Sequence, residues 1–104
     1  MNIPIFPLPI FLLPGGITRL RVFEPRYLKM VTIATQQDGF AILPYNSELA
    51  IDQSNIASWV EIINFDQEED GVLNIDVRCK ALVDITSLIV DADGLRYANV
   101  NKRD

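Results

Sequence analysis

The chain has 104 residues, which fits one domain with one modest hydrophobic core. Hydrophobic residues make up 49% of it and charged residues 22%, so the composition is that of a globular protein and excludes a disordered one. The formal net charge of −5 disfavours general binding to nucleic acid, because such a surface repels phosphate groups.

The average charge hides an asymmetry along the chain. Residues 1–34 carry four basic side chains and one acidic side chain, a net charge of +3, whereas the remainder carries −8. The basic residues are Arg19, Arg21, Arg26 and Lys29. They form either a basic patch for an anionic partner or an ordinary solvated surface spread over several faces, and we favour the second interpretation.

Residues 2–14 alternate proline with large apolar side chains. The prolines would break the helix of a signal peptide, and the segment is too short to span a bilayer, so we expect neither. Because proline donates no hydrogen bond to a strand ladder, we expect an edge strand that becomes an irregular apolar loop, not a central strand. A turn at 14–16 and a short strand over 17–22 follow, with the arginines on the opposite face from Leu20.

One helix is expected, beginning at Glu24-Pro25 and ending near Gly39. Proline suits the first helical turn, where its missing N–H has no partner, and glycine suits the C-terminal end. Side chains at helical spacing should face the core. They are Tyr27, Leu28, Val31 and Ala34.

The rest of the chain is predicted to form strands and one polar loop, over residues 46–55. The expected strands are 40–43, 56–65, 73–80, 85–90 and 95–100. Acidic hairpin turns are expected at 67–71 and 91–94. Several short strands with tight turns predict a small barrel. The predicted core is Val22, Leu28, Val31, Phe40, Ile42, Val60, Ile62, Leu73, Ile75 and Val77.

The chain has no histidine and one cysteine, Cys79. This excludes Ser-His and Cys-His nucleophile pairs, imidazole metal sites, cysteine-rich zinc sites and an intrachain disulfide. Cys79 alternates with apolar residues and is interpreted as a small core side chain. The carboxylates of the two turns are interpreted as solvated turn residues, not as a calcium site. We therefore expect a cytoplasmic, non-catalytic protein with no cofactor and no metal.

Three stretches of the sequence closely resemble the opening of the Lon protease N-terminal (substrate-binding) domain family, and its stand-alone bacterial members in particular. They are Ile3–Leu8, Leu12–Gly16 and Leu20–Tyr27. The order of the later elements matches as well, over nearly the whole chain. The resemblance implies a single domain over residues 1–104 that is mainly β. Its fold would be a small PUA-like pseudo-barrel of short, mostly antiparallel strands with one early α-helix.

The chain departs from the family's pattern in three places. Cys79-Lys80 falls where a glycine is usual, and Ala57-Ser58 falls where glycine–threonine is common. The sequence also stops at Asp104, without the C-terminal helical extension of longer relatives.

The resemblance implies a module that recognises polypeptide and does not cleave it. The residues favour an apolar N-terminal loop and a strand edge as the binding surface for a peptide or protein partner, because that loop has more apolar side chains than it can easily bury. The candidate contact residues are Phe6, Leu8, Ile10, Phe11, Leu12, Arg26, Tyr27 and Trp59.

Several candidates have a structural alternative. Arg26 and Tyr27 form either the polar rim of a groove or local contacts, with Glu24 capping the helix, Arg26 paired with an acid and Tyr27 packed on the barrel. Trp59 is turned away from the predicted core, which favours an interface unless another segment covers it. For the whole chain, the alternatives to peptide binding are RNA binding, as in many PUA-like barrels, and a structural domain that works as a homodimer.

Overall fold

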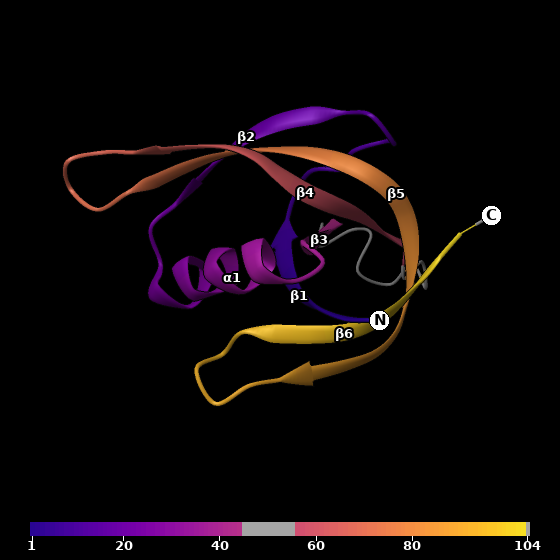
Figure 1. Cartoon of the computed structure of the whole chain (residues 1–104). Helices are drawn as coiled ribbons and strands as arrows, with labels where there is room; N and C mark the ends of the chain where they lie inside the picture. The colour runs from indigo at the N-terminus through magenta and orange to yellow at the C-terminus, as the bar shows by residue number, and fades with distance from the viewer. Residues whose placement is uncertain (45–55, 104) are drawn as a thin grey trace.

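The computed structural model describes residues 1–44 and 56–103 (Figure 1). The elements are β1 (Asn2–Leu8), β2 (Ile17–Val22), α1 (Pro25–Gln36), β3 (Phe40–Pro44), β4 (Ile56–Gln67), β5 (Leu73–Val90) and β6 (Arg96–Lys102). The prediction of a mainly-β fold with one early helix is confirmed. The polar loop predicted over 46–55 lies outside the described residues. No described helix is long and apolar enough to cross a membrane.

Five strands close into a ring. β1 pairs with β3 and β6, β4 pairs with β3 and β5, and β5 also pairs with β6. β2 adds to β5 as a sixth strand. Every pairing is antiparallel except β1 with β3. The predicted small barrel is therefore confirmed, with β2 as an additional strand that is not part of the ring.

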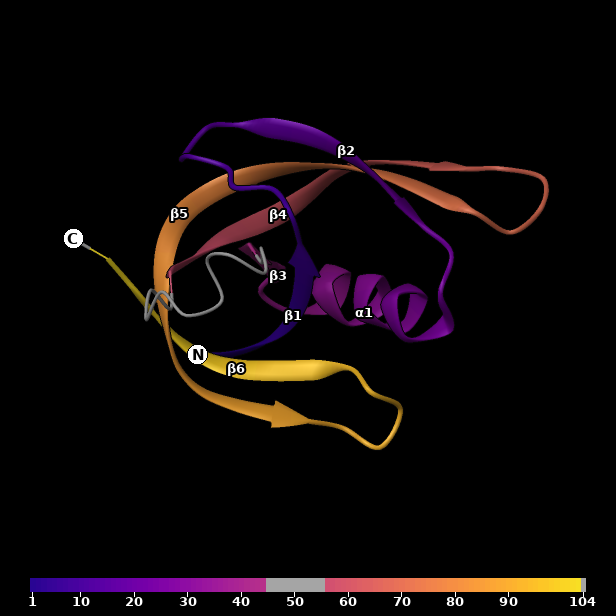
Figure 2. The ribbon, with the colours of Figure 1, turned by 180° about the vertical axis from the view of Figure 1, so that it is seen from behind.

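The strands predicted at 73–80 and 85–90 are one continuous strand, β5, of 18 residues. It pairs with β2 and β4 along its first part and with β6 along its last part. Its pairing with β4 shifts between Trp59 and Val60, and its pairing with β6 shifts between Ile85 and Ser87. Such bulges bend a strand, and Figures 1 and 2 show β5 curving around the molecule into two hairpin arms with α1 between them.

The prediction that the N-terminal strand lies at a sheet edge is wrong, because β1 lies between β3 and β6. The Met1 carbonyl accepts a hydrogen bond from the Val100 N–H of β6. The backbone N–H and C=O groups of the odd residues of β1 therefore point toward β6, and those of the even residues point toward β3. Pro4 therefore faces β3, but pairing with β3 begins only at Ile5. Pro7 faces β6, where pairing has ended at Ile5. Neither proline removes a ladder hydrogen bond, which is why this strand can be central.

Strands of the ring are buried on both faces, and the buried side chains form two cores. The ring core has members from all five ring strands: Ile3, Ile5, Ala41, Ala57, Trp59, Val83, Ala98 and Val100. The helix core lies between α1 and the opposite faces of the same sheet, with contributions from β2. Its members include Phe6, Tyr27, Met30, Phe40, Ile42 and Leu95.

The predicted core belongs to the helix core. All ten predicted residues are in it or packed against it, and only Leu28, Ile62 and Leu73 are partly exposed. Cys79 is buried there as predicted, and burial raises the pKa of its thiol. The ring core was not anticipated, because Trp59 was interpreted as facing away from the predicted core, with no second core on that side.

The helix ends near a glycine with positive φ, as expected, but no side chain caps its beginning. Pro25 occupies the first turn, whereas the Glu24 side chain makes no capping hydrogen bond, so that prediction is wrong. At the other end, the Gly39 N–H donates to the Ala34 carbonyl at 3.2 Å, with Gly39 at φ +74°. Glycine is needed there because it adopts positive φ without strain and because a Cβ would overlap the Val60 carbonyl oxygen.

Candidate functional site

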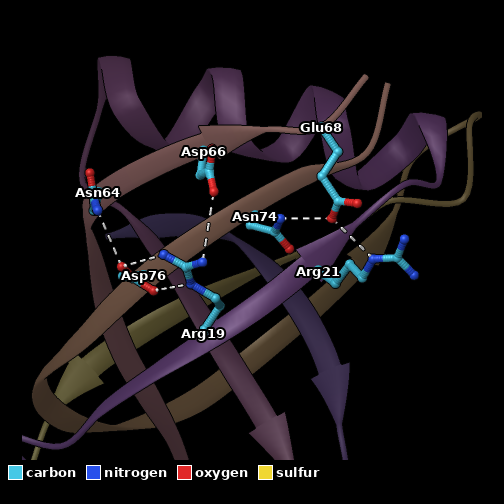
Figure 3. Close-up of polar contacts among 7 residues, drawn as sticks. All are labelled: Arg19, Arg21, Asn64, Asp66, Glu68, Asn74 and Asp76. Atoms are coloured by element: carbon cyan, nitrogen blue, oxygen red, sulfur yellow. Dashed lines mark hydrogen bonds and ion pairs between the residues drawn. The ribbon is translucent and has the colours of Figure 1, made fainter. Parts of the chain in front are cut away.

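The arginines of β2 lie in a polar ladder, a set of hydrogen-bonded polar side chains on the face of β2, β5 and β4 that is opposite to the helix core (Figure 3). Arg19 Nε donates to Asp76 Oδ1 at 2.8 Å, and Arg21 Nε donates to Glu68 Oε2 at 3.3 Å. The hydrogen bond from Arg19 lowers the pKa of Asp76. A hydrogen bond from Asn74, followed by the one from Arg21, lowers the pKa of Glu68.

Lys29 and Arg26 also have acidic partners. Lys29 Nζ lies 2.5 Å from Asp93 Oδ2 and 3.4 Å from Asp91 Oδ2, so α1 is tied to the β5–β6 turn. Arg26 lies 3.5 Å from Glu24. All four basic residues of the first third are thus paired with acids, and for three of these basic residues the acids belong to the last two thirds of the chain. The basic first third and the acidic remainder of the chain therefore neutralise each other through the polar ladder and the ion pairs of Lys29. This agrees with the solvated-surface interpretation.

A cleft of about 650 Å³ opens at the beginning of α1. The end of β1, the end of β2, the first turn of α1 and the end of β3 meet there. Its apolar lining comes from Phe6, Pro7, Leu8, Val22, Phe23 and Leu43. Phe23, the residue that follows β2, is 62% exposed. The volume is in the range of sites that hold a small ligand or a few side chains.

A stack of three side chains forms one wall of the cleft. The rings of Phe6 and Tyr27 are stacked with centroids 4.3 Å apart, and the Arg26 guanidinium lies 4.9 Å from the Tyr27 centroid. Arg26 also donates to the Gly94 carbonyl at 3.3 Å. These contacts fix the guanidinium at the rim. Tyr27 is buried and Arg26 is half-buried, and both also line the cleft. Local packing and a position at a groove are therefore compatible for this pair.

The polar lining of the cleft is mostly basic. Arg21, Arg26 and Arg96 contribute guanidinium groups, and Glu24 contributes one carboxylate. Arg96 begins β6 and pairs with Ile5 of β1 and Val90 of β5 in the sheet. Among residues 1–44 and 56–103, no carboxylate lies within ion-pair distance of Arg96.

The structure brings four of the eight predicted contact residues together in this cleft: Phe6, Leu8, Arg26 and Tyr27. Ile10 and Leu12 instead pack against the helix core. Phe11 is 46% exposed on the loop between β1 and β2, away from the cleft lining. That loop is held by Ser58, whose hydroxyl donates to the Leu12 carbonyl at 2.7 Å and accepts from the Leu12 N–H at 3.1 Å.

Trp59 is not a surface residue. It turns away from Val60 as the alternation predicted, but that face is the inside of the ring, and Trp59 is 7% exposed. Its indole N–H donates to the Asp38 carbonyl, and Lys80 Nζ lies 4.1 Å from the ring centroid. Trp59 is therefore a structural residue and is withdrawn from the candidate contacts.

Seven lining residues were not among the predicted contact residues: Pro7, Arg21, Val22, Phe23, Glu24, Leu43 and Arg96. Phe23 is next to Glu24-Pro25, and an apolar residue just before a helix could have suggested it. Arg96 carried no such signal, because it is far from the other lining residues in sequence and reaches them only through sheet pairing.

The acidic turns do not assemble a metal site in the part of the chain that is described. Asp91 and Asp93 bind Lys29, and Glu68 binds Arg21 and Asn74. No group of three or more potential metal-ligating side chains is found within residues 1–44 and 56–103. These carboxylates are thus engaged in ion pairs and turn hydrogen bonds.

A family model described as the ATP-dependent protease La (LON) substrate-binding domain matches residues 2–104. A solved structure of a Lon N-terminal domain protein from Xanthomonas campestris is similar, with 30% identity and a TM-score of 0.85; the match covers 100% of this chain and 60% of that one. None of the curated proteins matches significantly.

A second solved structure, the N-terminal domain of Mycobacterium avium complex Lon protease, has a TM-score of 0.77 at 12% identity. The match covers 100% of this chain and 55% of that one, and at this identity it shows the fold alone. The chain therefore spans less than two thirds of the length of either structure.

Proposed function

Since this chain belongs to the ATP-dependent protease La (LON) substrate-binding domain family, we propose that it is a non-catalytic, cytoplasmic module that binds polypeptide. The segment it binds would be unfolded or extended, and the binding site would be the cleft at the beginning of α1.

The observation that carries this proposal is the lining of the cleft. Aromatic and aliphatic side chains from four separate elements form its walls, with arginines at the rim. An apolar concavity with a few fixed polar groups suits apolar side chains of a flexible segment, because their burial drives binding while the rim holds the backbone or a charge. Phe23 supports the same site, since a largely exposed aromatic side chain beside a cleft is typical of an interface.

The outer edge of β2 would supply main-chain contacts. The Gly16 carbonyl accepts a hydrogen bond from the Cys79 N–H of β5. The backbone N–H and C=O groups of the even residues of β2 therefore point toward β5, and those of the odd residues point away from the sheet. Ile17, Arg19 and Arg21 thus present N–H and C=O groups to an added strand, and Arg21 also lines the cleft. On β1 the open side is occupied by Pro7, which has no N–H to offer.

Three exposed phenylalanines allow a matched test. Phe23 lies in the cleft, Phe11 on the apolar loop and Phe65 on the β4–β5 hairpin, with exposures of 62%, 46% and 50%. The probe is fluorescein-labelled, reduced and carboxymethylated α-lactalbumin, titrated with the wild type and with Phe23→Asp, Phe11→Asp and Phe65→Asp. Anisotropy reports binding, and circular dichroism confirms that each variant is folded.

We expect saturable binding that Phe23→Asp weakens at least about tenfold, because it places a charge where apolar area is buried. Phe65→Asp should bind like the wild type. If Phe11→Asp weakens binding instead, the site is the apolar loop and not the cleft. No binding at high micromolar protein would overturn the proposal of a polypeptide-binding module.

A second candidate function, homodimerisation, is favoured by the end of β5. Beyond Asp84, β5 pairs only with β6 among the described residues. Residues 85–90 carry no charge and no proline, and Leu88, Ile89 and Val90 are exposed. Natural edges are usually protected by charge, proline or a cover, so an apolar edge that no described residue covers fits pairing with the same edge of a second copy.

Sedimentation equilibrium between about 10 µM and 1 mM tests this second candidate. A dimer that Ile89→Lys dissociates, and that Ile17→Lys on β2 leaves intact, would support it. Ile17 is a close control because its exposure is 58%, against 61% for Ile89. A monomeric mass over the whole range would exclude dimerisation through this edge.

A further inference from the structure

The cleft has the opposite charge from the chain as a whole. Its lining carries three guanidinium groups against one carboxylate, whereas the chain has a net charge of −5. The other acidic side chains of residues 1–44 and 56–103 are not part of the lining. With Glu68, which pairs with Arg21, the balance is three basic groups against two acidic groups, so an excess of one positive charge remains at the cleft and favours a ligand with a negative group.

The three arginines differ in how much of their hydrogen-bonding capacity is used. Arg26 is held by Glu24 and by the Gly94 carbonyl. Arg21 donates its Nε to Glu68, and within residues 1–44 and 56–103 its two terminal nitrogens have no hydrogen-bond partner. Arg96 has no carboxylate partner within residues 1–44 and 56–103. Arg96 is therefore the guanidinium best placed to bind a carboxylate from outside.

The apolar lining and the Arg96 guanidinium, which no carboxylate of the described residues pairs with, lie in the same cleft. Phe6 and Leu8 come from β1, and Arg96 from the strand that pairs with the first half of β1. A ligand that fills the apolar part with a side chain therefore brings its neighbouring groups to the rim. A carboxylate at that position would make a charge-assisted, bidentate hydrogen bond with the planar guanidinium.

We propose that the cleft selects polypeptide segments in which a carboxylate accompanies a large apolar side chain, with Arg96 as the partner of the carboxylate. This inference rests on the proposed polypeptide binding and specifies its substrate class. The carboxylate comes either from an Asp or Glu side chain or from the C-terminus of the bound chain. An RNA phosphate is the competing anion, but the apolar lining favours polypeptide.

The experiment uses three labelled, unstructured 12-residue peptides that share one Leu-Phe pair. The first has Glu after the pair and an amidated C-terminus, and the second has Gln in place of that Glu. The third ends at the pair with a free carboxylate. Each is titrated by anisotropy with the wild type, Arg96→Gln and Arg78→Gln. Arg78 is the matched control, because it is an exposed arginine outside the cleft and its loss removes the same charge.

We expect the Glu peptide or the free-carboxylate peptide to bind the wild type about three- to tenfold more tightly than the Gln amide. Which of the two does so identifies the source of the carboxylate. Arg96→Gln should remove this preference without abolishing binding of the Gln amide, and Arg78→Gln should keep it.

Two outcomes would overturn the inference, and they are distinguishable. Equal binding of all three peptides, still weakened by Phe23→Asp, would leave polypeptide binding standing and remove the carboxylate preference. Absence of peptide binding, together with binding of a 12-nucleotide oligouridine that falls steeply with salt, would overturn both proposals in favour of RNA.

Discussion

The two cores of this domain use aromatic side chains differently. In the ring core, Trp59 is enclosed by five strands that pair around it. In the helix core, Phe6 and Tyr27 are buried as well, but the packing ends at the first turn of α1 and leaves a cleft. A closed ring of strands leaves no gap in its wall, whereas a helix packed on a sheet leaves a gap where the helix begins. In this fold, a binding site is therefore expected at the helix core.

The largest effect should come from emptying the ring core. Trp59→Ala removes a large side chain from an enclosed site, so we expect a loss of about 3–5 kcal/mol in the free energy of unfolding. Phe23→Ala, at the open end of the helix core, should change stability by no more than about 0.5 kcal/mol. Urea unfolding followed by circular dichroism measures both. Equal losses would mean that the cleft wall is as tightly packed as the ring.

Gly39 lies where the two cores meet. Its Cβ position is occupied by the Val60 carbonyl, and its φ is +74°. We expect Gly39→Ala to cost roughly 2–4 kcal/mol, from backbone strain and the displacement of β4. Gly71→Ala is the control, because that residue also has positive φ but open space around it. It should cost only about 1 kcal/mol of strain. Similar losses for the two variants would show that the close approach to Val60 is unimportant.

A smaller effect is expected where the apolar loop is fastened to the sheet. Ser58→Ala leaves the Leu12 N–H and C=O without their partner, at a cost of about 1–2 kcal/mol. The freed loop should also be cut faster by chymotrypsin, since Phe11 and Leu13 are exposed. Thr86→Ala, which removes an exposed hydrogen bond to Asn99, should change neither quantity measurably. An unchanged cleavage rate in Ser58→Ala would show that the loop has other anchors.

The smallest effect concerns the ion pair that joins α1 to the arm next to the cleft. The hydrogen bond from Lys29 lowers the pKa of Asp93 below its ordinary value of 3.8, and the hydrogen bond with Asp93 raises the pKa of Lys29 above 10.5. The carboxylate's contribution to stability is complete above pH 3.8 and is lost as the pH falls through the folded-state pKa. The contribution of Lys29 is complete below pH 10.5 and is lost as the pH rises through its own raised pKa.

Carboxyl-carbon NMR titration of Lys29→Met tests this pair directly. The pKa of Asp93 should rise toward 3.8, while the pKa of Asp76, which is lowered by Arg19 on another face, should stay where it is. An unchanged pKa of Asp93 would show that Lys29 does not make this contact in solution.

Much of the fold could be predicted from local pattern. Glu24-Pro25 marked the beginning of α1, and the acidic turns marked both hairpins. The alternation from Leu73 to Lys80 marked a half-buried strand. The position of β1 could not be predicted in this way. A proline lacks the N–H on one side of its strand only. Whether this removes a hydrogen bond depends on where the partner strand on that side begins and ends.

The candidate site was predicted only in part, for the same reason. Phe6, Leu8, Arg26 and Tyr27 were identified because they belong to two conspicuous local motifs. Trp59 was misjudged because alternation gives the face of a strand but not what covers that face.

By itself, then, the sequence determined the strand and turn periodicity, the early helix, the buried cysteine and the family, since each of these depends on neighbouring residues. The tertiary structure alone decided that β5 closes a ring, that Trp59 fills it, and that Arg96 joins Phe23 and Tyr27 at one cleft. Those outcomes depend on pairing between residues distant in sequence. In such pairing, register and burial on both faces of the sheet select one arrangement from the many that the local pattern allows.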